Sequence, residues 1–257
     1  MQFCAHLGYQ FNEYNGIDRL RHAAIAGFNA VEWPAIYDYD IDELVAITQE
    51  LGLSWAQITL PFGSTSRGEK GLAAIPGRES EFEFGLHQAV KYATALGANL
   101  IHPMSGVGIS LSDVNVMAVY MRNLQHAIHE AHQNGLQVVI EVISQATVPG
   151  YALSTYEDAG HILEHFPDVL LLVDAYHAQV LTGDPVAVVQ RWAGRIGHVQ
   201  IADYPGRNEP GTGQLDFVAF IHALRESGYN GFLGCEYKPL GHTLGGLRYL
   251  EHLKVYL

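Results

Sequence analysis

The sequence predicts an α/β fold, a single (β/α)8 barrel spanning residues 1–257, from its length, its alternating pattern and the way its helices end. A chain of 257 residues fits the size of one such barrel. Short apolar, β-rich runs alternate with longer amphipathic stretches throughout the chain. Several amphipathic stretches end in glycine and the next apolar run follows within a few residues. We therefore expect each strand to run parallel to the one before it.

The expected elements follow the chain in order. The strands should cover residues 2–8, 30–33, 53–60, 99–105, 137–143, 169–174, 196–203 and 231–237. The helices should cover residues 17–26, 41–51, 80–96, 113–134, 155–166, 185–194, 216–227 and 245–256. The competing architecture is a doubly wound sheet, but the first strand leads into HLGYQFNEYNG, which lacks a glycine-rich phosphate turn.

One connection is unusually long. Residues 61–79, PFGSTSRGEKGLAAIPGRE, are rich in glycine and serine and carry Arg67, Lys70 and Arg78. Long loops inside compact domains are often lids over sites, so the loop at about 61–79 is expected to be lid-like. The alternative is a mobile surface segment.

Composition limits the class of partner. Hydrophobic residues make up 48% and charged residues 16% of the chain, which is typical of a compact globular protein. The formal charge of −13 disfavours nucleic acid and anionic membrane surfaces. Two cysteines, Cys4 and Cys235, are too few for a disulfide framework and are expected as free thiols. With no secretory or membrane-spanning pattern recognised, we expect a cytoplasmic protein, and a homo-oligomer stays open.

Polar residues end four consecutive expected strands, the fifth to the eighth. They are Glu141, Asp174, Gln200 and Glu236. Because active sites of these barrels lie at the carboxyl-terminal ends of the strands, and period-two alternation points all four inward, we expect them to converge. Lysine and arginine are scarce nearby, so a metal is the expected counter-charge. An all-oxygen donor set favours Mg²⁺ or Mn²⁺, one ion per chain.

Each acidic residue also has a plainer interpretation, as a rim residue that caps a helix. Five further residues are weaker candidates for binding substrate: His177, Arg207, Lys238, His6 and His102. Core histidines bonded to carbonyl groups and rim cations that offset local negative charge are the alternatives for them.

The motifs VIEV around Glu141, VDAYHAQ at Asp174, GHVQIAD at Gln200 and GCEYKP at Glu236 resemble the hydroxypyruvate isomerase family, within the xylose isomerase-like barrel superfamily. The resemblance covers nearly the whole chain. It implies a divalent-metal isomerase that interconverts hydroxypyruvate and tartronate semialdehyde, a small anionic hydroxy-keto acid pair. It also implies these four residues as metal ligands, with the two glutamates as the acid/base pair.

Alternatives remain beside this resemblance. The 2-oxo-tetronate isomerases share the motifs, and the sequence does not separate the two groups. Related ketose epimerases have histidine where Gln200 stands, which disfavours epimerisation. Apurinic endonucleases of the superfamily need more histidine ligands and a DNA-binding face, which the charge of −13 argues against. A non-catalytic sugar-acid binding barrel would not need both glutamates.

Overall fold

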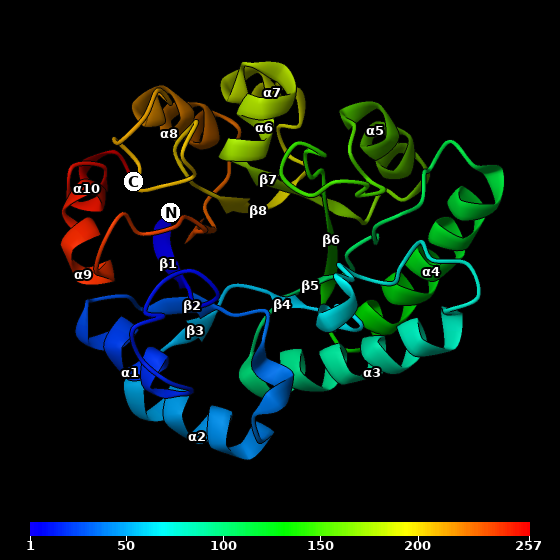
Figure 1. Ribbon diagram of the computed structural model, residues 1–257, viewed down its shortest axis with the longest axis horizontal. Helices are drawn as coiled ribbons and strands as arrows, with labels where there is room; N and C mark the ends of the chain where they lie inside the picture. The colour runs from blue at the N-terminus through cyan, green and yellow to red at the C-terminus, as the bar shows by residue number, and fades with distance from the viewer. The chain divides into compact units, whose positions relative to one another are not determined.

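The computed structural model describes residues 1–257 as two compact units. The first unit comprises Met1–Ala56 and Leu172–Leu257, and the second comprises Gln57–Leu171. Each unit contains parallel strands flanked by helices (Figure 1).

The strands of the first unit are β1 (Gln2–His6), β2 (Ala30–Glu32), β3 (Ser54–Trp55), β8 (Ile196–Gln200), β9 (Phe232–Cys235) and the last three residues of β7 (Leu170–Asp174). Their order is β3-β2-β1-β9-β8-β7, so neighbours in the sheet are neighbours in the chain. The exception joins the chain's first and last strands: residues 2–5 of β1 pair in parallel with residues 232–235 of β9. Pairing of the first strand with the last is typical of a closed barrel.

The helices of the first unit are α1 (Asp18–Ile25), α2 (Ile41–Leu51), α6 (Ala175–Thr182), α7 (Pro185–Arg191), α8 (Phe217–Glu226), α9 (Thr243–Gly246) and α10 (Arg248–Glu251). Local chemistry fixes α2. The Asp40 carboxylate accepts hydrogen bonds from the backbone of Asp42 and Glu43 at its start. At its end Gly52 adopts a φ of 64°, which a glycine tolerates.

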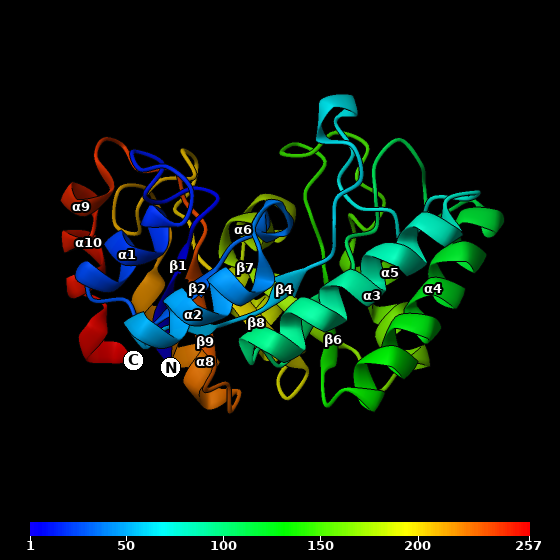
Figure 2. The same cartoon turned by 90° about the horizontal axis from the view of Figure 1, so that it is seen from below.

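The second unit holds β4 (Ile58–Thr59), β5 (Leu100–His102) and β6 (Gln137–Glu141) in the order β6-β5-β4, with α3 (Glu79–Leu96), α4 (Val114–Gln133) and α5 (Tyr156–His165). Helices α3 and α4 lie side by side (Figures 1 and 2). Val138, Val139 and Ile140 are all buried in succession. A continuous apolar run is typical of a parallel strand covered on both faces.

Two expected elements differ from the structure, and one helix was not expected. The strand expected over 53–60 is two short strands, β3 and β4. The helix expected over 245–256 is broken into α9, α10 and a 3-10 turn at Lys254–Tyr256; the Gly245-Gly246 pair at the first break has low helix propensity. Helix α6 was not expected, and it begins because Asp174 caps it.

The second half of the 61–79 loop is part of the core of the second unit. Leu72, Ala73 and Ala74 are buried. The Asn123 side chain donates to the Ala73 carbonyl at 2.8 Å, and the Ala74 amide donates to the Ser105 carbonyl at 2.8 Å. This anchoring argues against the surface-segment interpretation for this half of the loop. No helix in the structure is both long enough and apolar enough to cross a membrane.

Candidate active site

Polar side chains meet at the carboxyl-terminal ends of the strands of the first unit. His6, Glu32, Asp174 and Gln200 are the last residues of their strands, and Glu236 directly follows β9. The first four are at most 3% exposed, and the Glu236 side chain is 16% exposed. Buried charges are costly unless they are paired, so the partners of these groups define what the site can do.

Asp174 has two functions in its immediate surroundings. Its Oδ1 accepts hydrogen bonds from the backbone of Tyr176 at 2.7 Å and His177 at 3.4 Å, which caps α6. Its Oδ2 faces the other side chains of the cluster. The helix-capping interpretation is therefore correct for one oxygen, while the second oxygen is free of that task.

Arg207 lies against two of the carboxylates. Its Nη2 donates to Asp174 Oδ2 at 2.9 Å and to Glu236 Oε2 at 3.0 Å. The guanidinium carbon is 5.6 Å from the ring centre of Tyr9 and 5.2 Å from that of Tyr176, within cation–π distance of both. Lysine and arginine are scarce near these carboxylates in the sequence, yet Arg207 contacts two of them, because the loop after β8 folds back over the strand ends.

That loop is organised by a buried aspartate which the sequence analysis did not single out. The Asp203 Oδ2 accepts hydrogen bonds from the amides of Gly211 and Gly213 at 2.8 Å each, and its Oδ1 accepts one from Leu215 at 3.0 Å. The Asp203 carbonyl accepts from the Arg207 amide at 2.8 Å. Arg207 itself has a φ of 54°, a left-handed conformation that is uncommon for a residue with a side chain.

The single positive charge of Arg207 does not balance the negative charges of the carboxylates around it. Burial, together with the nearby charges of Asp174 and Glu32, raises the pKa of Glu236 to about 8 although Arg207 opposes the shift. His6 Nε2 lies 3.6 Å from Glu236 Oε1, but burial lowers the pKa of His6, so at neutral pH it adds little positive charge. The site therefore holds a carboxyl group that is readily protonated near neutral pH.

His177 and Lys238 occupy different environments. His177 lies on α6, where the sequence analysis expected a loop, and its Nε2 is 3.3 Å from Arg207 Nη1 and 3.6 Å from Asp174 Oδ2. Burial lowers the pKa of His177 to about 4, so its neutral ring can accept from Arg207. Lys238 is exposed, and its backbone amide donates to the Arg207 carbonyl at 2.8 Å. Arg207 and His177 thus join the cluster, whereas the described contact of Lys238 is made by its backbone.

Glu32 links two residues of β8. Its Oε2 lies 2.8 Å from His198 Nε2, and its Oε1 accepts from Gln200 Nε2 at 3.1 Å. Burial opposes ionisation, yet the charge and hydrogen bond of His198 lower the pKa of Glu32 to about 2. His198 is thus a buried residue that pairs with a carboxylate 166 positions away along the chain. Separation along the chain hides such a contact from sequence reasoning.

The two remaining predicted site residues lie in the second unit. Glu141 ends β6 and is 6% exposed, and His102 ends β5 and is 3% exposed. His102 Nε2 lies 3.9 Å from Glu141 Oε2. The structure thus brings this histidine and this glutamate together, as neighbouring parallel strands with a common carboxyl-terminal edge require.

The donor set of the first unit fits a hard divalent cation. Asp174, Gln200 and Glu236 offer oxygen atoms, which Mg²⁺ and Mn²⁺ prefer. Gln200 Oε1 is buried and makes no hydrogen bond. A bound cation would give the unpaired Gln200 oxygen a partner, and it would stabilise the ionised form of Glu236.

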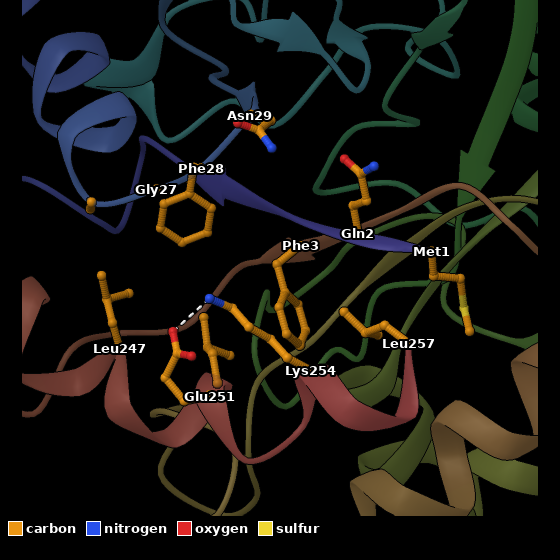
Figure 3. Close-up of a pocket in the computed structure, with 12 residues that line it drawn as sticks. Met1, Gln2, Phe3, Gly27, Phe28, Asn29, Leu247, Glu251, Lys254 and Leu257 are labelled. Atoms are coloured by element: carbon orange, nitrogen blue, oxygen red, sulfur yellow. Dashed lines mark hydrogen bonds and ion pairs between the residues drawn. The ribbon is translucent and has the colours of Figure 1, made fainter.

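A cavity of about 430 Å³ lies at the opposite ends of the strands of the first unit (Figure 3). Phe3, Phe28 and Leu250 line it, and Lys254 pairs with Glu251 beside it at 2.6 Å. The lining holds one exposed ion pair and no set of buried acid and base groups. Volume alone therefore does not identify the active site in this unit.

Comparisons with known proteins agree with the geometry. The family model described as "Xylose isomerase-like TIM barrel" matches residues 20–253. The chain is 36% identical over 254 residues to the hydroxypyruvate isomerase of Escherichia coli, covering 98% of each chain. The chain belongs to the xylose isomerase-like TIM barrel family.

Two further relatives refine this assignment. The 2-oxo-tetronate isomerase of Cupriavidus necator is 36% identical over 253 residues, with 97% of each chain covered. A crystal structure titled as an AP endonuclease, family 2, from Brucella melitensis has a TM-score of 0.93 at 34% identity, with 98% of each chain covered. The predicted α/β TIM-barrel fold is confirmed. Within the family, the chain is an isomerase of the hydroxypyruvate isomerase and 2-oxo-tetronate isomerase group.

Proposed function

We propose that this protein is a divalent-metal-dependent isomerase that interconverts hydroxypyruvate and tartronate semialdehyde by proton transfer. The observation that carries the proposal is the oxygen-donor cluster at the ends of β7, β8 and β9. Asp174 and Glu236 share one arginine, and Gln200 presents a buried oxygen with no hydrogen bond. Such an arrangement suits a cation and an anionic substrate together.

Four residues are proposed to hold one Mg²⁺ or Mn²⁺: Asp174, Gln200, Glu236 and, from the second unit, Glu141. When bound, the cation would polarise the substrate carbonyl and make the adjacent carbon-bound proton more acidic. The donor chemistry supports the hard cations, because the four side chains supply only oxygen atoms.

Glu236 and Glu141 are proposed as the acid/base pair. One carboxylate removes a proton from C3 of hydroxypyruvate, which gives an enediolate; a proton moves from O3 to O2, and a proton returned to C2 yields tartronate semialdehyde. We favour Glu236 as the first base; the oxygen that is turned away from the cation would accept the proton, because coordination lowers the basicity of a carboxylate oxygen. The Glu236 side chain is 16% exposed, which leaves the carboxyl group accessible.

Binding of the substrate oxygens requires hydrogen-bond donors close to the proposed acid/base pair. Arg207 offers a charged fork beside both carboxylates, and the neutral His177 ring lies next to it. We propose that these two residues bind the substrate oxygens. His6 and, from the second unit, His102 are proposed to add further polar contacts, and Lys238 to draw the substrate carboxylate to the rim. A local cation is needed because the net charge of −13 repels an anion at long range.

A 2-oxo-tetronate is the second candidate substrate. The observation that favours it is the 36% identity to a 2-oxo-tetronate isomerase, which equals the identity to a hydroxypyruvate isomerase. Both compounds are small hydroxy-keto acids and need the same proton transfer.

Proton NMR of the purified protein with each candidate acid tests the proposal. We expect turnover of one acid with Mg²⁺ or Mn²⁺ and none with excess EDTA. In D₂O the product should contain deuterium at the carbon that receives the proton. Binding of either acid without turnover would replace the proposal with a sugar-acid binding protein. Full retention of substrate hydrogen would contradict the proton-transfer route.

A further inference from the structure

A buried hydrogen-bond chain reaches from β2 to the amide of Gln200. Glu32 and His198 are each 1% exposed, and Gln200 is 3% exposed. The two Glu32 oxygens are both engaged, one with His198 Nε2 at 2.8 Å and one with Gln200 Nε2 at 3.1 Å. Glu32 is therefore positioned by His198, and it accepts a hydrogen bond from Gln200.

This hydrogen-bond chain fixes the orientation of the Gln200 amide group. An ionised carboxylate only accepts hydrogen bonds, so it pairs with the amide nitrogen. If the amide were reversed, its oxygen would face the Glu32 oxygen at the same separation, and two acceptors would repel each other. In the observed orientation Gln200 Oε1 is left buried and without a hydrogen bond.

The neighbouring strand is shaped to admit the Glu32 carboxylate. Gly234 on β9 lies so close that a Cβ atom there would collide with Glu32 Oε1 and crowd Gln200 Cγ. A glycine at this position leaves space for the carboxylate between β2 and β8. Three strands thus contribute to one arrangement around one amide group.

We propose that Glu32 is a positioning residue, which orients the Gln200 side chain so that its oxygen is presented to the divalent cation. The inference rests on the proposed function, because it gives Gln200 the task of a metal ligand. In this proposal Glu32 acts through Gln200, because its two oxygens contact His198 and Gln200. Groups that orient a ligand typically change metal affinity by about 10–100-fold when they are removed.

Mn²⁺ affinity tests the proposal without relying on turnover. Free Mn²⁺ is measured by electron paramagnetic resonance during titration of the metal-stripped protein. We expect Glu32→Met, which removes the acceptor at similar volume, to weaken Mn²⁺ binding by about 10–100-fold. Glu43→Gln on α2 is the control, because Glu43 is exposed in the same unit, and it should bind Mn²⁺ like the wild type.

An isosteric exchange keeps the test valid if Glu32→Met does not fold. The double variant Glu32→Gln with Gln200→Glu swaps carboxylate and amide across the same hydrogen bond and conserves the charge. We expect it to bind Mn²⁺ close to the wild-type affinity, whereas each single variant should bind differently. The inference is overturned if folded Glu32→Met binds Mn²⁺ with wild-type affinity. It is also overturned if Gln200→Glu changes the Mn²⁺ affinity by the same factor in the wild type and in the Glu32→Gln variant.

The wild type separates this failure from failure of the proposed function. If the wild type binds no Mn²⁺, the proposed metal dependence is wrong, and the inference falls with it. If the wild type binds Mn²⁺ and the variants do so equally well, only the positioning role of Glu32 is wrong.

Discussion

The two ends of the strands in the first unit differ in chemistry. At the carboxyl-terminal end, Asp174, Glu236 and Arg207 form a buried charged cluster with contacts of 2.9 and 3.0 Å. At the amino-terminal end, Phe3 and Phe28 line a cavity of about 430 Å³. The end with the cavity has the space, but the other end has the acid and base groups. The candidate active site is therefore distinguished by paired and perturbed charges and not by volume.

The largest expected effect tests the charged end. Glu236→Gln removes a proposed proton carrier while it keeps the size of the side chain. We expect turnover of hydroxypyruvate to fall by about 10²–10⁴-fold with little change in melting temperature. Proton NMR and thermal unfolding measure the two quantities, and Glu141→Gln should behave in the same way. Near-normal turnover in either variant would show that the pair is assigned wrongly.

Phe28→Ala tests the opposite end of the same strands. Phe28 is 7% exposed, so the substitution enlarges the apolar cavity. We expect it to lower the free energy of unfolding by about 3 kcal/mol and to leave turnover unchanged in the folded protein. Urea denaturation and the NMR assay are the measurements. A large loss of turnover without loss of stability would mean that this cavity takes part in catalysis.

Arg207 tests two properties of the carboxyl-terminal end, because it neutralises carboxylates there and is also proposed to bind substrate. Arg207→Met leaves Asp174 and Glu236 without a protein cation. We expect kcat/KM for hydroxypyruvate to fall by about 10–100-fold, mainly through KM, at saturating Mg²⁺. We also expect a lower melting temperature in EDTA. Arg207→Lys should recover part of the stability but not the second contact, which Nη1 makes with His177. Wild-type kinetics in the methionine variant would remove Arg207 from the substrate site.

The smallest effect is expected from the ion pair beside the cavity. Glu251 and Lys254 have side chains that are 63% and 53% exposed. We expect Glu251→Gln to change the free energy of unfolding by about 0.5 kcal/mol or less, because water and salt screen an exposed pair. The same urea denaturation provides the measurement. A loss of unfolding free energy as large as that of Phe28→Ala would show that this ion pair stabilises the protein despite its exposure to solvent.

Much of the site could be predicted from strand ends. Asp174 and Gln200 end apolar runs, and Glu236 follows one, which identifies them locally. His177 was assigned to a loop because the capping of α6 by Asp174 is a side-chain contact that the local pattern does not specify. Arg207 was expected nearby, but its contact with both carboxylates depends on the loop that Asp203 organises.

By itself, the sequence determined the alternation of strands and helices, the free state of Cys4 and Cys235, and the position of acidic residues at strand ends. These follow from periodicity and capping, which act over a few residues. Only the tertiary structure decided that Glu32 holds Gln200 and that Arg207 joins two carboxylates. Such contacts connect residues that are far apart along the chain, and folding of the strands brings them together at one edge. Their geometry depends on strand register and loop path, which no local pattern specifies.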